Sequence, residues 1–258
     1  MAMAANSQNR DASEARRTLA LALLPLLDLT SLGEDDTPAQ IESLCAAARN
    51  RHAMPAAVCI YPEHITTATR ALHGTRVRVA TVVNFPDGSS GRERVLRETR
   101  RALAAGADEI DLVLPQKLDS PNDRLTAQAV VRACRELCTD GVTLKAILET
   151  GTLQSSYRIR QACDIGLGAG VDFLKTSTGK AAGGATLEAT AVMLDAIAAG
   201  GGQCGIKVAG GVRSIVQAEQ YLAQARARFG SSWITPAHFR IGASNLFDEL
   251  VTAISMCS

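Results

Sequence analysis

The sequence lacks the long apolar stretch that a membrane protein needs. In this chain of 258 residues, the apolar run 19–29 (LALALLPLLDL) is shorter than a membrane span and is interrupted by Pro25 and Asp28. Arg16 and Arg17 precede the run, as basic residues do in a signal peptide, but no small-residue cleavage site follows it. We therefore expect neither a signal peptide nor a membrane partner.

The sequence also lacks an excess of charge and a metal-binding motif. The formal net charge is +1, from 27 Lys and Arg against 26 Asp and Glu, so nothing indicates a nucleic acid as partner. The seven cysteines are scattered without a Cys-x-x-Cys pair, and the four histidines show no ligand spacing. We expect no metal, no cofactor and reduced thiols, as in a cytoplasmic protein.

What the sequence does contain is a regular alternation of apolar, β-branched runs with amphipathic helical patterns. The expected strands cover residues 23–28, 56–61, 77–85, 109–114, 143–149, 172–176, 205–209 and 239–243. The expected helices cover residues 37–51, 63–73, 91–105, 122–139, 155–169, 186–199, 214–228 and 245–255. Asn122 and Ser155 are the residue types that cap helix N-termini.

Near-continuous apolar strands that alternate with helices indicate a parallel sheet with helical crossovers. Eight such units predict an α/β fold, a (β/α)₈ TIM barrel that forms a single domain. The alternative is an open doubly wound sheet, which normally has fewer strands, and the first strand is not followed by Gly-x-Gly-x-x-Gly. Residues 1–12 are polar and expected to be disordered, which leaves 13–258 for the barrel.

Active sites of this fold lie where the strands end. The charged residues expected at that mouth are Asp28, Asp111, Lys145, Lys175 and Lys207. A single lysine on a strand is usually a surface residue with a buried stem. However, the three lysines recur at equivalent places in successive units, and barrel strands are covered on both faces, so we expect them to point inward together.

Two other residues near these strand ends receive ordinary structural interpretations. Glu149 is the last residue of the fifth expected strand and is interpreted as a loop or cap residue rather than a catalytic one. Cys59 lies on the second strand and is interpreted as core packing, since a small thiol buries well.

Glycine-rich loops follow the last three expected strands. Glycines let backbone N–H groups approach an anion closely, and the loops after strands 7 and 8 of a barrel commonly form a phosphate site. The alternative is that these are only tight turns. The residues expected to hold a phosphate are Thr178, Gly179, Lys180, Gly210, Gly211, Gly242 and Ser244.

Neighbouring lysines at such a mouth favour imine chemistry. Two close ammonium groups repel each other, so one of them loses its proton more readily. A fall in lysine pKa from about 10.4 to about 7 raises the neutral fraction at pH 7 roughly a thousandfold. A neutral amine beside a phosphate site can attack the carbonyl of a sugar phosphate, and the protonated imine then acts as an electron sink without a metal.

Motifs from almost every unit carry a resemblance to a known family. They read LLDLTSL, VCIYP, VVNFPDG, DEIDLVLP, LKAILETG, DFLKTSTGK, KVAGGVR and IGASN. From about residue 20 to about residue 250 the chain resembles the deoxyribose-phosphate aldolases, class I aldolases on the TIM-barrel fold.

The resemblance implies reversible cleavage of 2-deoxy-D-ribose 5-phosphate to D-glyceraldehyde 3-phosphate and acetaldehyde, in deoxyribose catabolism. It implies that Lys175 forms the Schiff base, while Lys207 perturbs it and joins Asp111 in proton transfer. Gly210, Gly211 and Ser244, with the loop 178–180, would hold the phosphate. The expected partners are thus a small sugar phosphate and an aldehyde, and we also expect a homodimer.

Three positions depart from the family pattern. Longer bacterial members usually have proline where Val208 stands and serine where Asn245 stands, and they often end in a tyrosine thought to assist proton transfer, whereas this chain ends ISMCS. The missing tyrosine leaves the full rate of the proton step open. Another sugar-phosphate aldolase, or a phosphate-binding protein without activity, remains an alternative.

Overall fold

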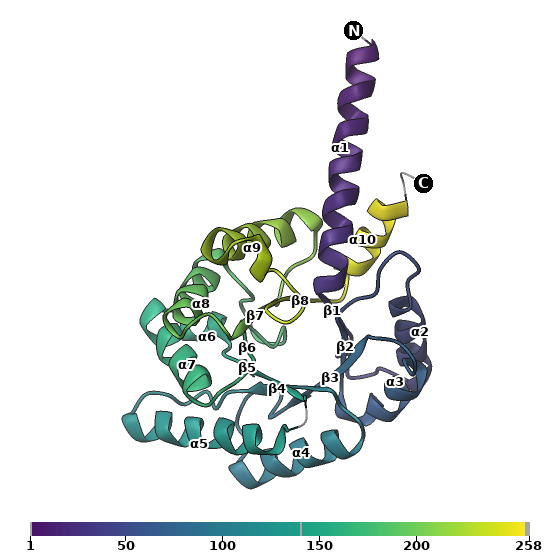
Figure 1. The fold of residues 1–258 in the computed structure, drawn as a ribbon. Helices are drawn as coiled ribbons and strands as arrows, with labels where there is room; N and C mark the ends of the chain where they lie inside the picture. The colour runs from purple at the N-terminus through teal and green to yellow at the C-terminus, as the bar shows by residue number, and fades with distance from the viewer. Residues whose placement is uncertain (1, 140, 256–258) are drawn as a thin grey trace.

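Eight parallel strands close into a barrel in this computed structural model, which describes residues 2–139 and 141–255, with residues 2–10 described by backbone alone (Figure 1). Each strand pairs with the next, and the last pairs with the first. The strands are β1 (Leu27–Thr30), β2 (Ala57–Ile60), β3 (Arg78–Val83), β4 (Glu109–Val113), β5 (Thr143–Ile147), β6 (Phe173–Lys175), β7 (Gly205–Ala209) and β8 (Phe239–Ala243). The predicted TIM barrel is confirmed, and the open sheet is wrong.

Helices surround the barrel and cover the outer face of its strands (Figure 1). The α-helices are α1 (Ala2–Leu23), α2 (Pro38–Ala48), α3 (Ile65–Ala71), α4 (Arg92–Ala104), α5 (Pro121–Leu137), α6 (Thr150–Leu153), α7 (Ser156–Gly168), α8 (Leu187–Ala199), α9 (Ile215–Phe229) and α10 (Leu246–Ser255). Short 3₁₀ turns are η1 (Leu24–Leu26), η2 (Pro62–His64) and η3 (Ser231–Trp233). None of the helices in the described part of the chain is both long and apolar enough to cross a bilayer.

Helix α1 differs from the sequence expectation, which placed a strand at residues 23–28. Leu23 ends the helix, η1 follows, and β1 begins only at Leu27. The apolar residues Ala20, Leu23 and Leu24 recur at helical spacing and are buried, and α1 packs against α10. A short apolar run does not by itself distinguish a helix from a strand. The helix also continues outward over residues 2–12, for which disorder stays a prediction.

Side chains cap the N-termini of α2, α5, α7, α8 and α9, although one predicted cap is wrong. Ser155 caps α7, as expected. At α5 the cap is Ser120 rather than Asn122: the Ser120 hydroxyl accepts from the Asp123 N–H, the Asp123 carboxylate accepts from the Ser120 N–H, and Pro121 occupies the first helical position. Proline has no N–H to satisfy at that position, so the helix begins earlier than the apolar pattern indicates.

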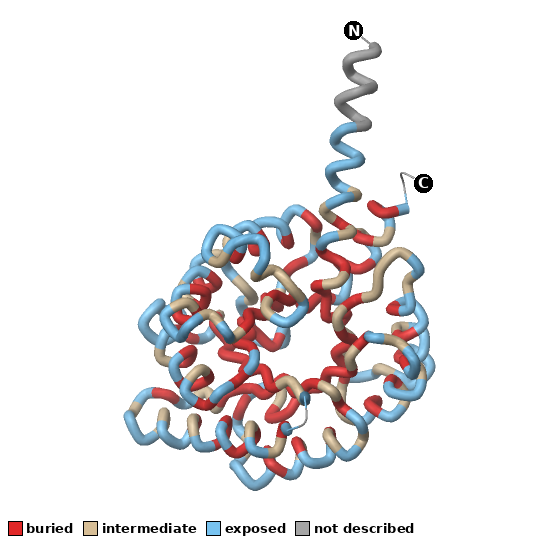
Figure 2. The backbone as a smooth tube through the Cα atoms, in the orientation of Figure 1, coloured by how far each residue is buried: buried red, intermediate tan, exposed pale blue. Residues whose placement is uncertain are grey.

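The side chains that fill the barrel interior differ in size from strand to strand. Figure 2 shows buried backbone concentrated along the strands and on the inner sides of the helices. On β2 and β3 the interior positions carry small residues, which form a separate apolar group of Ala57, Cys59, Ala80 and Val82. Small residues there leave volume for the long side chains that the other strands send inward.

Gly205 at the start of β7 is required by close packing. A Cβ atom at this position would lie 2.5 Å from the Phe173 ring and 2.7 Å from the His238 carbonyl oxygen. We expect Gly205→Ala to lower the free energy of unfolding by about 1–3 kcal/mol, as overpacking does. Urea denaturation followed by circular dichroism measures this change.

Gly200 at the end of α8 provides the matched control. A Cβ atom there would have ordinary contacts of 3.5 Å or more, so Gly200→Ala should change stability by less than about 0.5 kcal/mol. Equal effects of the two substitutions would contradict the packing argument.

Candidate active site

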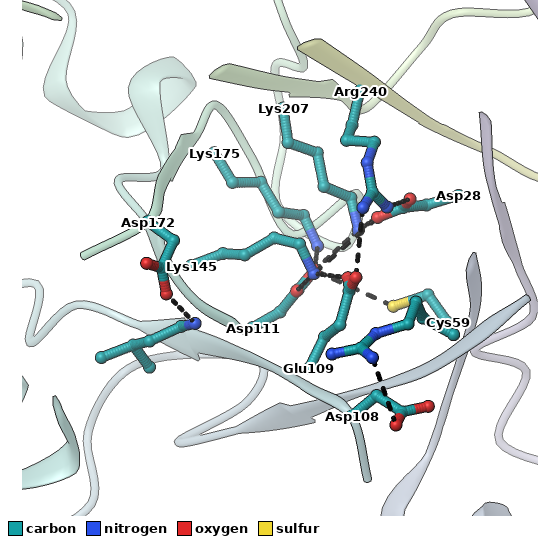
Figure 3. A network of polar contacts seen from close by, with 12 residues as sticks. Asp28, Cys59, Asp108, Glu109, Asp111, Lys145, Asp172, Lys175, Lys207 and Arg240 are labelled. Atoms are coloured by element: carbon teal, nitrogen blue, oxygen red, sulfur yellow. Dashed lines mark hydrogen bonds and ion pairs between the residues drawn. The ribbon is translucent and has the colours of Figure 1, made fainter. Parts of the chain in front are cut away.

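Charged side chains from six strands meet inside the barrel in a group that we call the charge cluster (Figure 3). It consists of Asp28, Glu109, Asp111, Lys145, Lys175, Lys207 and Arg240. Each of these residues is buried, with at most 6% of its surface exposed. Charges taken this far out of water must be paired with one another.

The strand register brings these residues together. Asp111 on β4 is the register partner of Lys145 on β5, and Lys175 on β6 is the register partner of Lys207 on β7. Register partners on parallel strands point to the same face, so each pair enters the interior at one level. The prediction that the three lysines point inward together is confirmed.

Asp111 lies at the centre of the charge cluster. Its Oδ1 is 2.7 Å from the Nζ of Lys145, and its Oδ2 is 2.8 Å from the Nζ atoms of both Lys175 and Lys207. Burial alone would raise the pKa of Asp111, but the three lysines outweigh it and hold that pKa well below its usual range. Asp111 is therefore an ionised carboxylate that accepts hydrogen bonds from three amines.

A second level of ion pairs lies beside Asp111. The Asp28 carboxylate is 2.6 Å from both Lys207 Nζ and an Arg240 guanidinium nitrogen. Glu109 accepts from Lys145 and from Arg240. The sequence interpretation missed Glu109 and Arg240. The alternation of strand side chains could have found Glu109, because it stands two residues before Asp111 and shares its face.

The charges of the cluster do not balance when every group is ionised. Three carboxylates, of Asp28, Glu109 and Asp111, face four basic side chains, of Lys145, Lys175, Lys207 and Arg240. With one lysine neutral, three cations would face three anions. A neutral lysine therefore removes the one unmatched charge from a buried site.

Lys175 is the lysine that the structure favours for this neutral state. Its burial is the largest effect and lowers its pKa; Asp111 opposes this, and the charge of Lys207 adds to the lowering. Burial would also lower the pKa of Lys207, but Asp111 and Asp28 outweigh it and raise that pKa well above its usual value. Among the described residues, Lys175 pairs with one carboxylate, whereas Lys207 pairs with two.

Lys175 also borders a cavity of about 410 Å³ at the mouth of the barrel. The loops after β1, β6, β7 and β8 line it. Every residue predicted to hold a phosphate is part of this lining: Thr178, Gly179, Lys180, Gly210, Gly211, Gly242 and Ser244. Gly210 and Gly211 have φ angles of 89° and 92°, in the left-handed region that favours glycine.

Other predicted residues lie away from this lining, and some lining residues were not predicted. Of the five charged residues expected at the mouth, Lys175 lines the cavity, whereas Asp28, Asp111, Lys145 and Lys207 are fully buried in the charge cluster and are not among the lining residues. The loop after β1 was missed, although Ser31 and Asp36 line the cavity. That loop carries no glycine-rich pattern that would have marked it. Residues 256–258, in the segment compared with the family tyrosine, lie outside the described residues.

Cys59 and Glu149 occupy buried positions near the site. Cys59 belongs to the small apolar group on β2 and β3, as expected, and its Sγ lies 3.9 Å from Asp111 Oδ2. Burial raises the pKa of the Cys59 thiol. Glu149 precedes α6 in the predicted cap position, but its side chain does not cap that helix and turns instead to Thr178.

Comparison with known proteins agrees with this geometry. The chain is 42% identical to a deoxyribose-phosphate aldolase of Agrobacterium fabrum over 241 residues, which are 93% of each protein. It is also similar to the crystal structure of a candidate deoxyribose-phosphate aldolase from Coccidioides immitis, with 29% identity, a TM-score of 0.78 and coverage of 89% of this chain and 86% of the other.

A second solved structure, of the apo form of a candidate deoxyribose-phosphate aldolase from Toxoplasma gondii, is 25% identical with a TM-score of 0.85, covering 93% of this chain and 97% of the other. The family model of the DeoC/LacD aldolases matches residues 22–243, which include the whole charge cluster and nearly all of the cavity lining. The chain therefore belongs to the DeoC/LacD aldolase family.

Proposed function

We propose that this protein is a class I aldolase that reversibly cleaves 2-deoxy-D-ribose 5-phosphate to D-glyceraldehyde 3-phosphate and acetaldehyde. The observation that carries the proposal is Lys175, a buried lysine with a lowered pKa that borders a cavity ringed by glycine loops. The 42% identical relative is named for this activity.

The reaction begins with the neutral amine of Lys175, which attacks the C1 carbonyl of the open-chain sugar. Loss of water from the resulting carbinolamine gives a protonated imine. Asp111 Oδ2, 2.8 Å from the Lys175 Nζ, is the nearest base, and Lys207 shares the same oxygen. These two groups form a short path along which the protons of this step can move.

Carbon–carbon cleavage follows from the imine. Removal of the proton from the C3 hydroxyl forms the aldehyde of glyceraldehyde 3-phosphate, and the C2–C3 electron pair moves into the imine to give an enamine. Protonation of C2 and hydrolysis then release acetaldehyde and restore Lys175. Asp111 and Lys207 are fully buried, so their charges act on each proton transfer with little screening by bulk water.

The glycine loops would hold the 5-phosphate at the other end of the cavity. Gly210, Gly211 and Ser244 precede or begin the turns into α9 and α10, and backbone N–H groups at such turns bind anions. Lys180 lines the same cavity and would add a positive charge.

Two further expectations stay predictions. The described cysteines are free thiols, which supports a cytoplasmic location for the enzyme. The homodimer expected from the sequence also stays a prediction.

Borohydride trapping tests the Schiff base. Reduction in the presence of deoxyribose 5-phosphate should inactivate the enzyme and leave a stable adduct on Lys175, because among the lysines of the charge cluster it is Lys175 that borders the cavity. Peptide mass mapping locates the adduct, and Lys175→Arg should abolish both labelling and turnover. An adduct on Lys145 or Lys207 would overturn the assignment.

Ser244→Asp tests the phosphate end of the cavity. A carboxylate at this position would repel the phosphate dianion, so KM for deoxyribose 5-phosphate should rise by about tenfold or more. The kcat/KM for unphosphorylated deoxyribose should change much less. Steady-state kinetics on both substrates measure the difference, and equal losses on the two would show that Ser244 does not contact the phosphate.

Lys207→Met tests the charge balance. The variant leaves three carboxylates facing three basic groups, those of Lys145, Lys175 and Arg240. A protonated Lys175 then balances the charge cluster, so the pKa of Lys175 should rise toward the reference value of about 10.4. A neutral amine exists above its pKa, so the pH profile of imine formation should move to higher pH. Its plateau should also fall, because Lys207 no longer carries protons.

Rapid-mixing measurements of imine formation across pH give the profile. Lys117→Met is the matched control, since it removes a lysine whose side chain is 79% exposed, outside the charge cluster, and should leave the profile in place. A lower plateau with an unmoved profile would mean that Lys207 only carries protons and that burial alone lowers the pKa of Lys175.

A further inference from the structure

We propose that Glu149 is a positioning residue for the phosphate-binding loop 178–180, a role that rests on the proposed function of this cavity. Glu149 does not line the cavity itself. It would act through Thr178, by fixing the shape that the loop presents to a phosphate group.

The backbone of Glu149 is held in an unfavourable conformation. Its φ and ψ are 57° and 58°, in the left-handed region, although it carries a full side chain; it lies two residues after the end of strand β5. Such a conformation is strained for a residue with a side chain, and it persists where surrounding contacts fix it. The conformation turns the carboxylate toward the loop after β6 instead of toward the N-terminus of α6.

The contacts of Glu149 reach the cavity in two steps. Its Oε2 accepts a hydrogen bond from the Thr178 backbone N–H at 3.1 Å and another from the Thr178 hydroxyl. The Thr178 hydroxyl oxygen in turn accepts from the Lys180 backbone N–H at 3.0 Å. A main-chain bond of 2.9 Å from the Thr150 N–H to the Thr176 carbonyl holds the two segments together beside this chain of contacts.

These contacts change the role expected of Thr178. Both of its donors, the backbone N–H and the hydroxyl, point to Glu149, so they are not aimed at a ligand in the cavity. Thr178 is therefore held in place rather than holding the phosphate. The contact to the Lys180 N–H fixes the backbone on the far side of Gly179, whose φ is 81°.

The barrel itself gains little from this arrangement. Glu149 is only 3% exposed, and its second oxygen, Oε1, has no hydrogen-bond partner among the described residues. A buried carboxylate with an unpaired oxygen and a left-handed backbone is unfavourable for stability. A carboxylate that gathers two donors from one loop residue, however, keeps the loop rigid and lowers the cost of ordering it around a ligand.

Two substitutions of Glu149 separate positioning from a simple contribution to stability. Glu149→Gln keeps an acceptor oxygen where Oε2 stands and so should keep KM for deoxyribose 5-phosphate within about threefold of the unaltered enzyme. Glu149→Leu removes the acceptor and should raise that KM by about tenfold or more, with kcat changed less than KM. The kcat/KM for unphosphorylated deoxyribose should change by less than about threefold in both variants.

Thr178→Val provides a second test if Glu149→Leu does not fold. It removes the hydroxyl bonds to Glu149 and Lys180 but keeps the backbone N–H bond to Glu149, so its KM for deoxyribose 5-phosphate should rise clearly above that of Glu149→Gln but by less than about tenfold. Circular dichroism and thermal unfolding establish that each variant is folded. Equal losses on the two sugars, or equal damage from Gln and Leu, would overturn the proposal.

Binding of inorganic phosphate keeps this test independent of the reaction. Isothermal titration of the full chain with phosphate should show weaker binding in Glu149→Leu and nearly unchanged binding in Glu149→Gln. If the unaltered protein binds phosphate in this pattern but does not cleave deoxyribose 5-phosphate, the proposed function fails while the positioning role stands. If cleavage occurs but phosphate binding is the same in all variants, the positioning role fails alone.

Discussion

One buried carboxylate determines how the interior of this barrel is organised. Asp111 pairs with three lysines, and without its charge those amines would lie inside the protein with much less compensation. Its own ionisation depends on them in return, since their charges outweigh the effect of burial on its pKa. The chemistry assigned to Lys175 therefore depends on the whole set of neighbours. Under that assignment, Lys175 can lose its proton because the other basic groups already pair with the carboxylates.

This arrangement also changes how the barrel is filled. Barrel interiors are usually packed with layers of branched apolar side chains. Here long charged side chains occupy much of that space, while β2 and β3 contribute small residues such as Ala57 and Ala80. The main apolar core lies instead between the strands and the surrounding helices. The outer faces of the strands thus carry the apolar packing that stabilises the fold, while their inner faces carry the charged groups proposed for the chemistry. The apolar packing outside offsets the cost of an interior that is rich in charge.

The sequence predicted the barrel and the lysines well because both signals repeat. Apolar strands at regular spacing specify the parallel sheet, and Lys145, Lys175 and Lys207 recur at equivalent places along it. It could not predict features that depend on one contact in space. The apolar run before β1 packs as a helix because α10 offers it a partner, and Arg240 is isolated in sequence from the carboxylates that it pairs with. The loop after β1 approaches the cavity only through closure of the sheet.

Closure of the sheet has a consequence for how the chain reaches its native state. Asp28 and Arg240 are 212 positions apart in the sequence, and they come from the first and last strands of the barrel. Contacts of such long range form slowly, because a large loop must be ordered before they contribute. Until β8 joins β1, Asp28 and Glu109 lack the guanidinium that they share, and their burial is unfavourable. The buried ion pairs are thus complete only once the ring closes, and Lys175, the proposed nucleophile, acquires its full surroundings only then.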